Sequence, residues 1–187
     1  MIRSFIAVDL PQEVRARLHE YGRELKELGL KGSFTRPDSF HLTLKFLGNI
    51  AEQQVEEIGS ALEHAVRGAK PFQVDVRRLG VFPGPSNPRV VWMGLERSEA
   101  LESLQQRIEE AAEALGFGRE GRPFRPHLTL VRLKSKDNLK ALGEYLRKAG
   151  PEASAGTVLV NEVVLFRSDL RPDGARYSRL RTVPLGA

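Results

Sequence analysis

The tetrapeptide His-Leu-Thr-Leu occurs twice in this chain, at residues 41–44 and again at 127–130. Side chains alternate between the two faces of a β-strand, so in each copy the histidine and threonine point to one face and the leucines to the other. Each copy therefore presents an imidazole beside a hydroxyl group and anchors its strand in the core through leucine. A lone histidine on a strand is more often structural, but a second one in the same pattern favours a shared chemical role.

His41, His127, Thr43 and Thr129 have the properties that phosphodiester chemistry requires when no metal takes part. Imidazole titrates near neutral pH, so one histidine can act as general base and the other as general acid in a single turnover. The threonine hydroxyls can donate hydrogen bonds to the non-bridging phosphate oxygens, where negative charge must be stabilised. We therefore predict that these four residues are catalytic and that the site needs neither a metal nor a cofactor.

The sequence lacks the motifs that several other kinds of active site require. His19 and His64 lie on predicted helices without the spacing of zinc ligands, and neither a P-loop nor a serine hydrolase elbow occurs. The one Gly-x-Gly-x-x-Gly match, at 116–121, follows a predicted helix and precedes a strand, which reverses the order of a dinucleotide-binding motif, so we interpret it as a loop. The absence of cysteine excludes thiol catalysis, disulfide scaffolds and zinc fingers.

The 187-residue chain carries 29 Lys and Arg against 24 Asp and Glu, a net charge of +5. This excess is compatible with an anionic partner such as RNA, and also with an ordinary arginine-rich surface. The length suits a single domain over residues 1–187. No apolar run approaches the roughly 20 residues of a membrane span and no signal peptide is evident, so we expect a cytoplasmic monomer that binds no membrane.

The elements that position the two motifs recur along the chain. Hydrophobic patterns in the first half predict alternating strands and helices over residues 3–10, 11–28, 40–47, 52–67 and 72–79. After a proline-rich loop at 83–88, the second half predicts a strand at 89–95, a helix at 98–115, a strand at 124–130, a helix at 137–148 and strands at 157–167 and 176–183. Each histidine has nearly the same spacing to its neighbouring elements, which indicates an internal duplication of units of about 1–82 and 89–187 that pack as pseudo-symmetric lobes. Coincidence among common α/β patterns is the alternative.

Paired His-x-Thr-x strands in a duplicated chain of this size resemble the two-histidine (2H) phosphoesterase superfamily, and most closely the RNA 2′,3′-cyclic phosphodiesterase family, also called 2′-5′ RNA ligase. The resemblance covers nearly the whole chain. The segments that carry it are residues 3–8, 40–48, 91–95 and 123–130.

This resemblance implies an α+β, bilobal fold in which antiparallel sheets flanked by helices surround a central active-site cleft. It implies metal-independent hydrolysis of an RNA 2′,3′-cyclic phosphate to a 2′-phosphomonoester, with reversible 2′-5′ ligation, which needs no ATP, in some members. In that family the first histidine is the proton donor and the second the proton acceptor, which here are His41 and His127.

Basic and aromatic residues near the motifs are candidates to bind phosphate or RNA. By strict alternation Lys45 shares a face with His41, and Arg125 shares one with His127, so we expect both to add positive charge to the site. Aromatic rings beside the motifs can stack on a base. The candidates are Lys45, Arg125, Arg132 and Phe46, with Phe40 and Phe124 as further aromatic neighbours. The alternatives are a solvated basic residue and a core aromatic.

Two other functions are compatible with the sequence. The chain can be a non-catalytic protein that binds RNA ends and uses the histidines only as phosphate donors. It can also be a cyclic phosphodiesterase that acts on small nucleotides, with the same chemistry and a different substrate.

Overall fold

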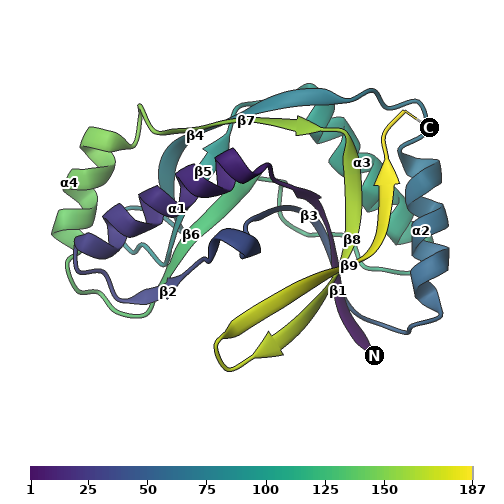
Figure 1. Ribbon diagram of the computed structural model, residues 1–187, viewed down its shortest axis with the longest axis horizontal. Helices are drawn as coiled ribbons and strands as arrows, with labels where there is room; N and C mark the ends of the chain where they lie inside the picture. The colour runs from purple at the N-terminus through teal and green to yellow at the C-terminus, as the bar shows by residue number, and fades with distance from the viewer. Residues whose placement is uncertain (187) are drawn as a thin grey trace.

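The structure, a computed structural model, describes residues 1–186 as two antiparallel β-sheets with four α-helices (Figure 1). The first sheet has the strand order β3-β1-β8-β9 and the second the order β2-β6-β5-β4-β7. The predicted α+β class with two antiparallel sheets flanked by helices is confirmed. In the part of the chain that the structure describes, no helix combines the length and apolar character needed to cross a membrane.

The helices and strands have the following bounds. The first sheet contains β1 (Ile2–Asp9), β3 (His41–Ile50), β8 (Glu162–Arg171) and β9 (Gly174–Pro184). The second contains β2 (Gly32–Phe34), β4 (Phe72–Phe82), β5 (Val90–Leu95), β6 (His127–Leu133) and β7 (Ser154–Val160). The helices are α1 (Gln12–Glu27), α2 (Gln54–Ala65), α3 (Glu99–Ala114) and α4 (Leu139–Ala149), and a short 3-10 helix, η1 (Pro37–Ser39), precedes β3.

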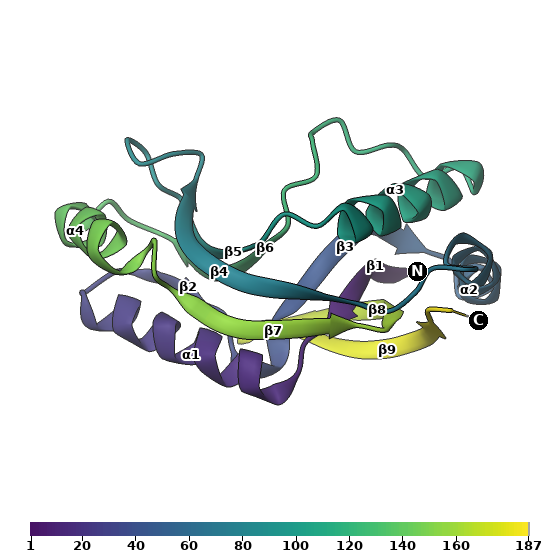
Figure 2. The same cartoon turned by 90° about the horizontal axis from the view of Figure 1, so that it is seen from above.

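The two lobes exchange elements between the halves of the chain. Strands β2 and β4 of the first half belong to the second sheet, and β8 and β9 of the second half belong to the first. Helix α1 packs against β6 and β7, whereas α3 packs against β3 and α2 (Figures 1 and 2). The prediction that each repeat unit forms its own lobe is therefore wrong, because each lobe is built from both halves. The duplication of units 1–82 and 89–187 itself stays a prediction.

One predicted strand, 157–167, is in fact two strands in different sheets. β7 ends at Val160 in the second sheet, and β8 begins at Glu162 in the first, so that Asn161 alone connects them. Buried valines on both sides of this crossing make the apolar pattern look continuous. The short β2 and η1 were also not predicted. The remaining predicted elements are present, with ends shifted by a few residues.

The leucines of both motifs lie in the main hydrophobic core, as the alternation predicts. Leu42, Leu44, Leu128 and Leu130 are at most 4% exposed. A second, smaller cluster of Phe5, Ala7, Val164 and Phe166, with Tyr177 packed against it, covers the opposite face of the first sheet. The first sheet therefore has one face in the main core and a second face on which an aromatic cluster surrounds its histidine.

Candidate active site

Each motif strand pairs with the first strand of its own half in the same register. In the first sheet His41 lies opposite Asp9 of β1, and in the second His127 lies opposite Gly94 of β5. The pairing shifts by one residue between Thr43 and Lys45, and in the same way between Thr129 and Val131. The fourth residue of each motif is therefore an extra residue in its strand, a β-bulge that interrupts the alternation of side chains.

The bulges change which residues share a face with the histidines. Burial over both motif strands follows one pattern, in which two consecutive buried residues are followed by an exposed one. The exposed residues are Phe46 and Arg132, which therefore lie on the face of His41 and His127. Strict alternation places both on the opposite face. Phe46 is 66% exposed, unusually high for a large apolar side chain.

The prediction that Lys45 shares a face with His41 is wrong. The bulge turns its side chain into the protein, where it is 5% exposed and its Nζ lies 2.6 Å from Oε1 of Glu109 on α3. The same Nζ donates a hydrogen bond of 2.6 Å to the carbonyl of Gly118, and Glu109 accepts one of 2.9 Å from the N–H of Glu120. Lys45 therefore joins β3 to the loop after α3 and adds no charge to the histidine face. This loop contains the Gly-x-Gly-x-x-Gly match and leads into the second motif, so its interpretation as a loop is confirmed.

Both imidazole rings are oriented by the same type of hydrogen bond. Nδ1 of His41 lies 3.2 Å from the carbonyl oxygen of Ser39, and Nδ1 of His127 lies 2.7 Å from that of Arg125. Because a carbonyl only accepts, each Nδ1 carries a proton, and in the neutral ring the lone pair is then on Nε2. Nε2 is therefore the nitrogen of each neutral ring that can accept a proton.

The segment before the first motif connects the two motif strands. The N–H of Thr35 donates to the carbonyl of Leu130, the bulge residue of β6, at 3.0 Å, and its hydroxyl donates to the carbonyl of Thr129 at 2.7 Å. The chain then passes through η1, whose last residue, Ser39, accepts the hydrogen bond from His41. Strands β3 and β6 also contact each other across the sheets. These contacts bring the two motif strands next to each other.

Aromatic rings enclose His41 on the sheet face. Its ring centroid lies 4.5 Å from that of Phe166, 5.1 Å from that of Tyr177 and 6.0 Å from that of Phe5, all in edge-to-face arrangements. The His41 side chain is 6% exposed. His127 has a single ring of this kind beside it in the described part of the chain, Phe82, with centroids 5.0 Å apart.

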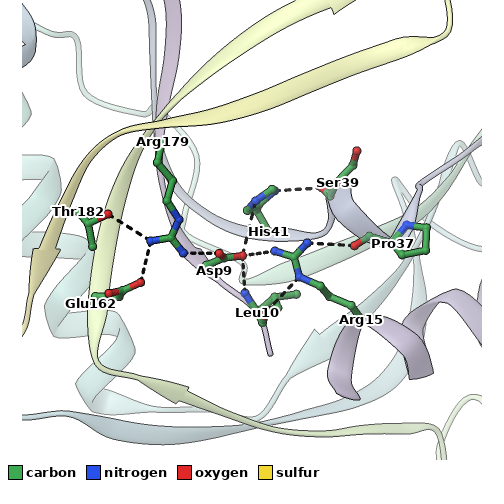
Figure 3. Close-up of polar contacts among 9 residues, drawn as sticks. All are labelled: Asp9, Leu10, Arg15, Pro37, Ser39, His41, Glu162, Arg179 and Thr182. Atoms are coloured by element: carbon green, nitrogen blue, oxygen red, sulfur yellow. Dashed lines mark hydrogen bonds and ion pairs between the residues drawn. The ribbon is translucent and has the colours of Figure 1, made fainter. Parts of the chain in front are cut away.

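An ion-pair network surrounds His41 (Figure 3). His127 lies opposite a glycine, and within residues 1–186 it is in no ion pair. Oδ1 of Asp9 lies 3.8 Å from Nε2 of His41, and the Asp9 carboxylate also pairs with Arg15 and Arg179. Arg15 donates to the carbonyl of Pro37 at 3.2 Å, and Arg179 pairs with Glu162 at 3.0 Å. The network ties β1, α1, η1, β8 and β9 together around one imidazole.

Burial and the two guanidinium groups hold His41 in its neutral form. Removal from water and, to a smaller extent, the charges of Arg15 and Arg179 lower the pKa of His41 to about 4, although Asp9 and the Ser39 carbonyl act in the opposite direction. Burial alone would raise the pKa of the Asp9 carboxyl, but the hydrogen bond from Arg179 and the charge of Arg15 outweigh it and lower that pKa. Asp9 is thus an anion beside a neutral imidazole.

The LigT-like phosphoesterase family model matches residues 8–92 and 94–177, which is most of the chain. The chain belongs to the LigT-like phosphoesterase family. It is 34% identical over 184 residues to the RNA 2′,3′-cyclic phosphodiesterase of Methanothermobacter thermautotrophicus, covering 98% of this chain and 99% of that protein. It is 32% identical to the protein of the same name from Thermotoga maritima, covering 96% and 93% of the two chains. The crystal structure of E. coli LigT complexed with 3′-AMP superposes with a TM-score of 0.80 at 27% identity, covering 100% of this chain and 99% of that one.

In this LigT-like phosphoesterase the structure brings together more residues than the motifs indicate. Asp9, Arg15, Arg179 and Tyr177 were not predicted, because their approach to His41 depends on strand pairing and not on spacing in the sequence. One feature of the sequence indicates Asp9, a charged residue that directly follows the apolar run Phe5–Val8 at the end of β1. Of the aromatic candidates, Phe40 is a core residue at 2% exposure. Phe124 is half-buried against the core. Arg125 is exposed, and its side-chain role stays a prediction.

We expect His41 in the free protein to titrate with a pKa of about 4. Substitution of Asp9 by Asn should lower this value further, because it removes an anion and leaves Arg15 and Arg179 unneutralised beside the ring. Two-dimensional NMR of the histidine side chains as a function of pH measures both values, with a His41→Asn variant to assign the signal. A His41 titration near 6.5, the ordinary value, would contradict the described environment.

Lys45→Met should destabilise the protein by about 3–5 kcal/mol, because it leaves the Glu109 carboxylate buried without its partner. The double variant Lys45→Met/Glu109→Met removes both charges and should recover most of that loss. Urea unfolding measures the free energies, and Lys70→Met, at an exposed position outside the site, is the control. A cost below about 1 kcal/mol, typical of exposed ion pairs, would show that Lys45 is solvated.

Proposed function

We propose that this chain hydrolyses the 2′,3′-cyclic phosphate ends of RNA to 2′-phosphomonoesters, with His41 and His127 as its acid and base. One observation carries the proposal: two His–Thr pairs lie at equivalent positions of two bulged strands, each with Nδ1 held by a carbonyl and Nε2 left for proton transfer. The names of the relatives, RNA 2′,3′-cyclic phosphodiesterase, support this substrate, and a nucleotide complex of E. coli LigT supports a nucleotide-sized ligand.

In the proposed reaction His127 accepts a proton from a water molecule as its oxygen attacks phosphorus. The bond between phosphorus and the 3′ oxygen breaks, and His41 donates a proton to that oxygen. The products are a free 3′-hydroxyl and a phosphate on the 2′ oxygen, and each histidine has exchanged one proton. Thr43 and Thr129 donate hydrogen bonds to the non-bridging oxygens, whose charge increases in the transition state. This set of residues supplies acid, base and charge stabilisation without a metal or another cofactor.

His41 must gain a proton before it can act as the acid, because burial holds it neutral in the free protein. A bound phosphodiester carries a negative charge, and an anion within a few ångströms raises the pKa of an imidazole. The substrate therefore helps to charge its own proton donor. His127 lies opposite Gly94 and has no carboxylate in the equivalent position, which suits the residue that begins the cycle as a neutral base.

The same geometry accommodates a 5′-hydroxyl in place of water. Attack by that hydroxyl on the cyclic phosphate forms a 2′-5′ linkage, breaks the same bond to the 3′ oxygen and consumes no ATP. This ligation and its reversal are part of the proposal, as are action in the cytoplasm and as a monomer. Arg125 is proposed to bind RNA on the approach to His127.

A non-catalytic RNA-end binder and a phosphodiesterase for small nucleotides are the alternatives. A binder has little need for a proton-accepting Nε2 in both rings, and the relatives named above are named as phosphodiesterases. The second alternative differs only in substrate length.

His41→Ala and His127→Ala should each lower the turnover number for a 2′,3′-cyclic mononucleotide by about a hundredfold or more, because each removes one partner in general acid–base catalysis. Thr43→Ala and Thr129→Ala should each have a smaller effect, since each removes only one hydrogen-bond donor. Steady-state kinetics of purified variants, with circular dichroism to verify folding, measures these effects.

His64→Ala is the matched control, because His64 is an exposed histidine on α2. Turnover near wild type in either His41→Ala or His127→Ala would overturn the proposed chemistry. A wild-type protein that binds the cyclic nucleotide without turning it over would favour the RNA-end binder.

A further inference from the structure

Arg3 lies on the motif face of the first sheet, beyond the reacting groups. On β1, Ala7 pairs with Thr43 and Phe5 pairs with Phe46, and the next residue that alternates onto this face is Arg3. With about 3.4 Å per residue, Arg3 lies about 14 Å along the strand from the position opposite Thr43. The motif face therefore continues from the His–Thr pair through an aromatic position to a guanidinium group, and Arg3 is exposed.

Arg132 of the second sheet approaches the same region. Burial raises the pKa of Tyr177, and the charges of Arg132, Arg3 and Arg36 oppose that rise, so all three guanidinium groups lie near its phenol. The Tyr177 ring is in turn 5.1 Å from the ring of His41. Cationic side chains from both sheets thus gather on one side of the proposed proton donor.

These arginines differ in how much of their charge is neutralised. Arg36 donates hydrogen bonds to the carbonyls of Asp173 and Ala175 and pairs with Asp38. Within residues 1–186, neither Arg3 nor Arg132 is in an ion pair with a carboxylate. Their charge is available to an anionic ligand.

An exposed aromatic ring between unneutralised guanidinium groups is the chemistry that binds single-stranded nucleic acid. Bases stack on the ring whatever their identity, and guanidinium groups bind the phosphates that connect them. Phe46, at 66% exposure, lies in the row between the Thr43 position and Arg3.

We propose that Phe46, Arg132 and Arg3 form a binding site for the nucleotides that precede the cyclic phosphate, so that the chain selects RNA strands over mononucleotides. This inference rests on the proposed function, because it needs the cyclic phosphate at the His–Thr pairs. The preceding base stacks on Phe46, and the inter-nucleotide phosphates bind Arg132 and Arg3. The reacting nucleotide by itself leaves Arg3 without a ligand.

The test compares two substrates, adenosine 2′,3′-cyclic phosphate and an adenosine trinucleotide that ends in a 2′,3′-cyclic phosphate. Arg3→Ala should lower kcat/KM for the trinucleotide by about tenfold, the effect of one charge-assisted hydrogen bond, and should change kcat/KM for the mononucleotide by less than about twofold. Arg23→Ala is the control for loss of one positive charge, because Arg23 is exposed on α1.

A third substrate shows whether Arg3 acts on phosphate. In a trinucleotide whose inter-nucleotide linkages are uncharged methylphosphonates, the wild type should lose at least as much activity as Arg3→Ala loses on the natural trinucleotide, because Arg132 loses its phosphate as well. Arg3→Ala should then lose little more, because the two changes remove the same interaction. Additive losses would overturn the assignment of Arg3 to the inter-nucleotide phosphates.

The inference is overturned if Arg3→Ala reduces activity equally on the mononucleotide and the trinucleotide, or leaves the trinucleotide unaffected. If the wild type hydrolyses neither substrate, the proposed function fails, and the inference is judged by binding. Fluorescence anisotropy with a labelled trinucleotide that ends in a 2′-phosphate then decides: about tenfold weaker binding by Arg3→Ala supports the site, and equal binding overturns it.

Discussion

The site depends on how each motif strand pairs with the first strand of its half. In both sheets the first three motif residues pair in the same order with the neighbouring strand, and the pairing shifts after the third motif residue. The resulting bulge keeps the leucines in the core and sends the sixth residue, Phe46 or Arg132, to the histidine face. Without it, Lys45 would share that face and Phe46 would lie toward the core. One irregularity of pairing, present in both sheets, therefore determines which side chains share a face with the histidines.

The two bulges are held in place by different partners. The carbonyl of Leu130 accepts a hydrogen bond from Thr35, whereas that of Leu44 accepts one from Gln105 of α3 at 3.4 Å. Each partner comes from the other half of the chain, as do the strands that complete each sheet. The exchange of elements thus ties the geometry of one motif to the fold of the other half.

The histidines occupy equivalent positions but differ in their electrostatic surroundings. Asp9 and its two arginines lie beside His41, and Gly94 occupies the corresponding position at His127. Acid–base catalysis by two histidines requires that one imidazole be protonated while the other is neutral. A protein favours one arrangement by placing the two rings in different environments. In the proposed reaction, the anionic substrate raises the pKa of the neutral His41, so that substrate binding is coupled to proton transfer.

Local patterns in the sequence predicted the four helices, most strands and the placement of the two His–Thr pairs on strands, because periodicity and repeated motifs are local properties. The bulge at Leu44 could not be predicted, since a long side chain such as Lys45 fits an exposed or a buried position, and Glu109, which decides between them, lies far along the chain. The crossing at Asn161 was missed because valines are buried on both sides of it. The network around His41 was missed because Asp9, Arg15 and Arg179 meet only through tertiary packing.

The central claim is that two histidines cleave a cyclic phosphate by breaking the bond to its 3′ oxygen, without a metal. The most direct test follows adenosine 2′,3′-cyclic phosphate by phosphorus NMR. The substrate is incubated with wild-type protein from which metals have been removed, in the presence of excess chelator. The account predicts complete conversion to adenosine 2′-monophosphate at a rate that chelation does not change. Formation of the 3′-monophosphate, or loss of activity that returns on adding a divalent metal, would contradict it.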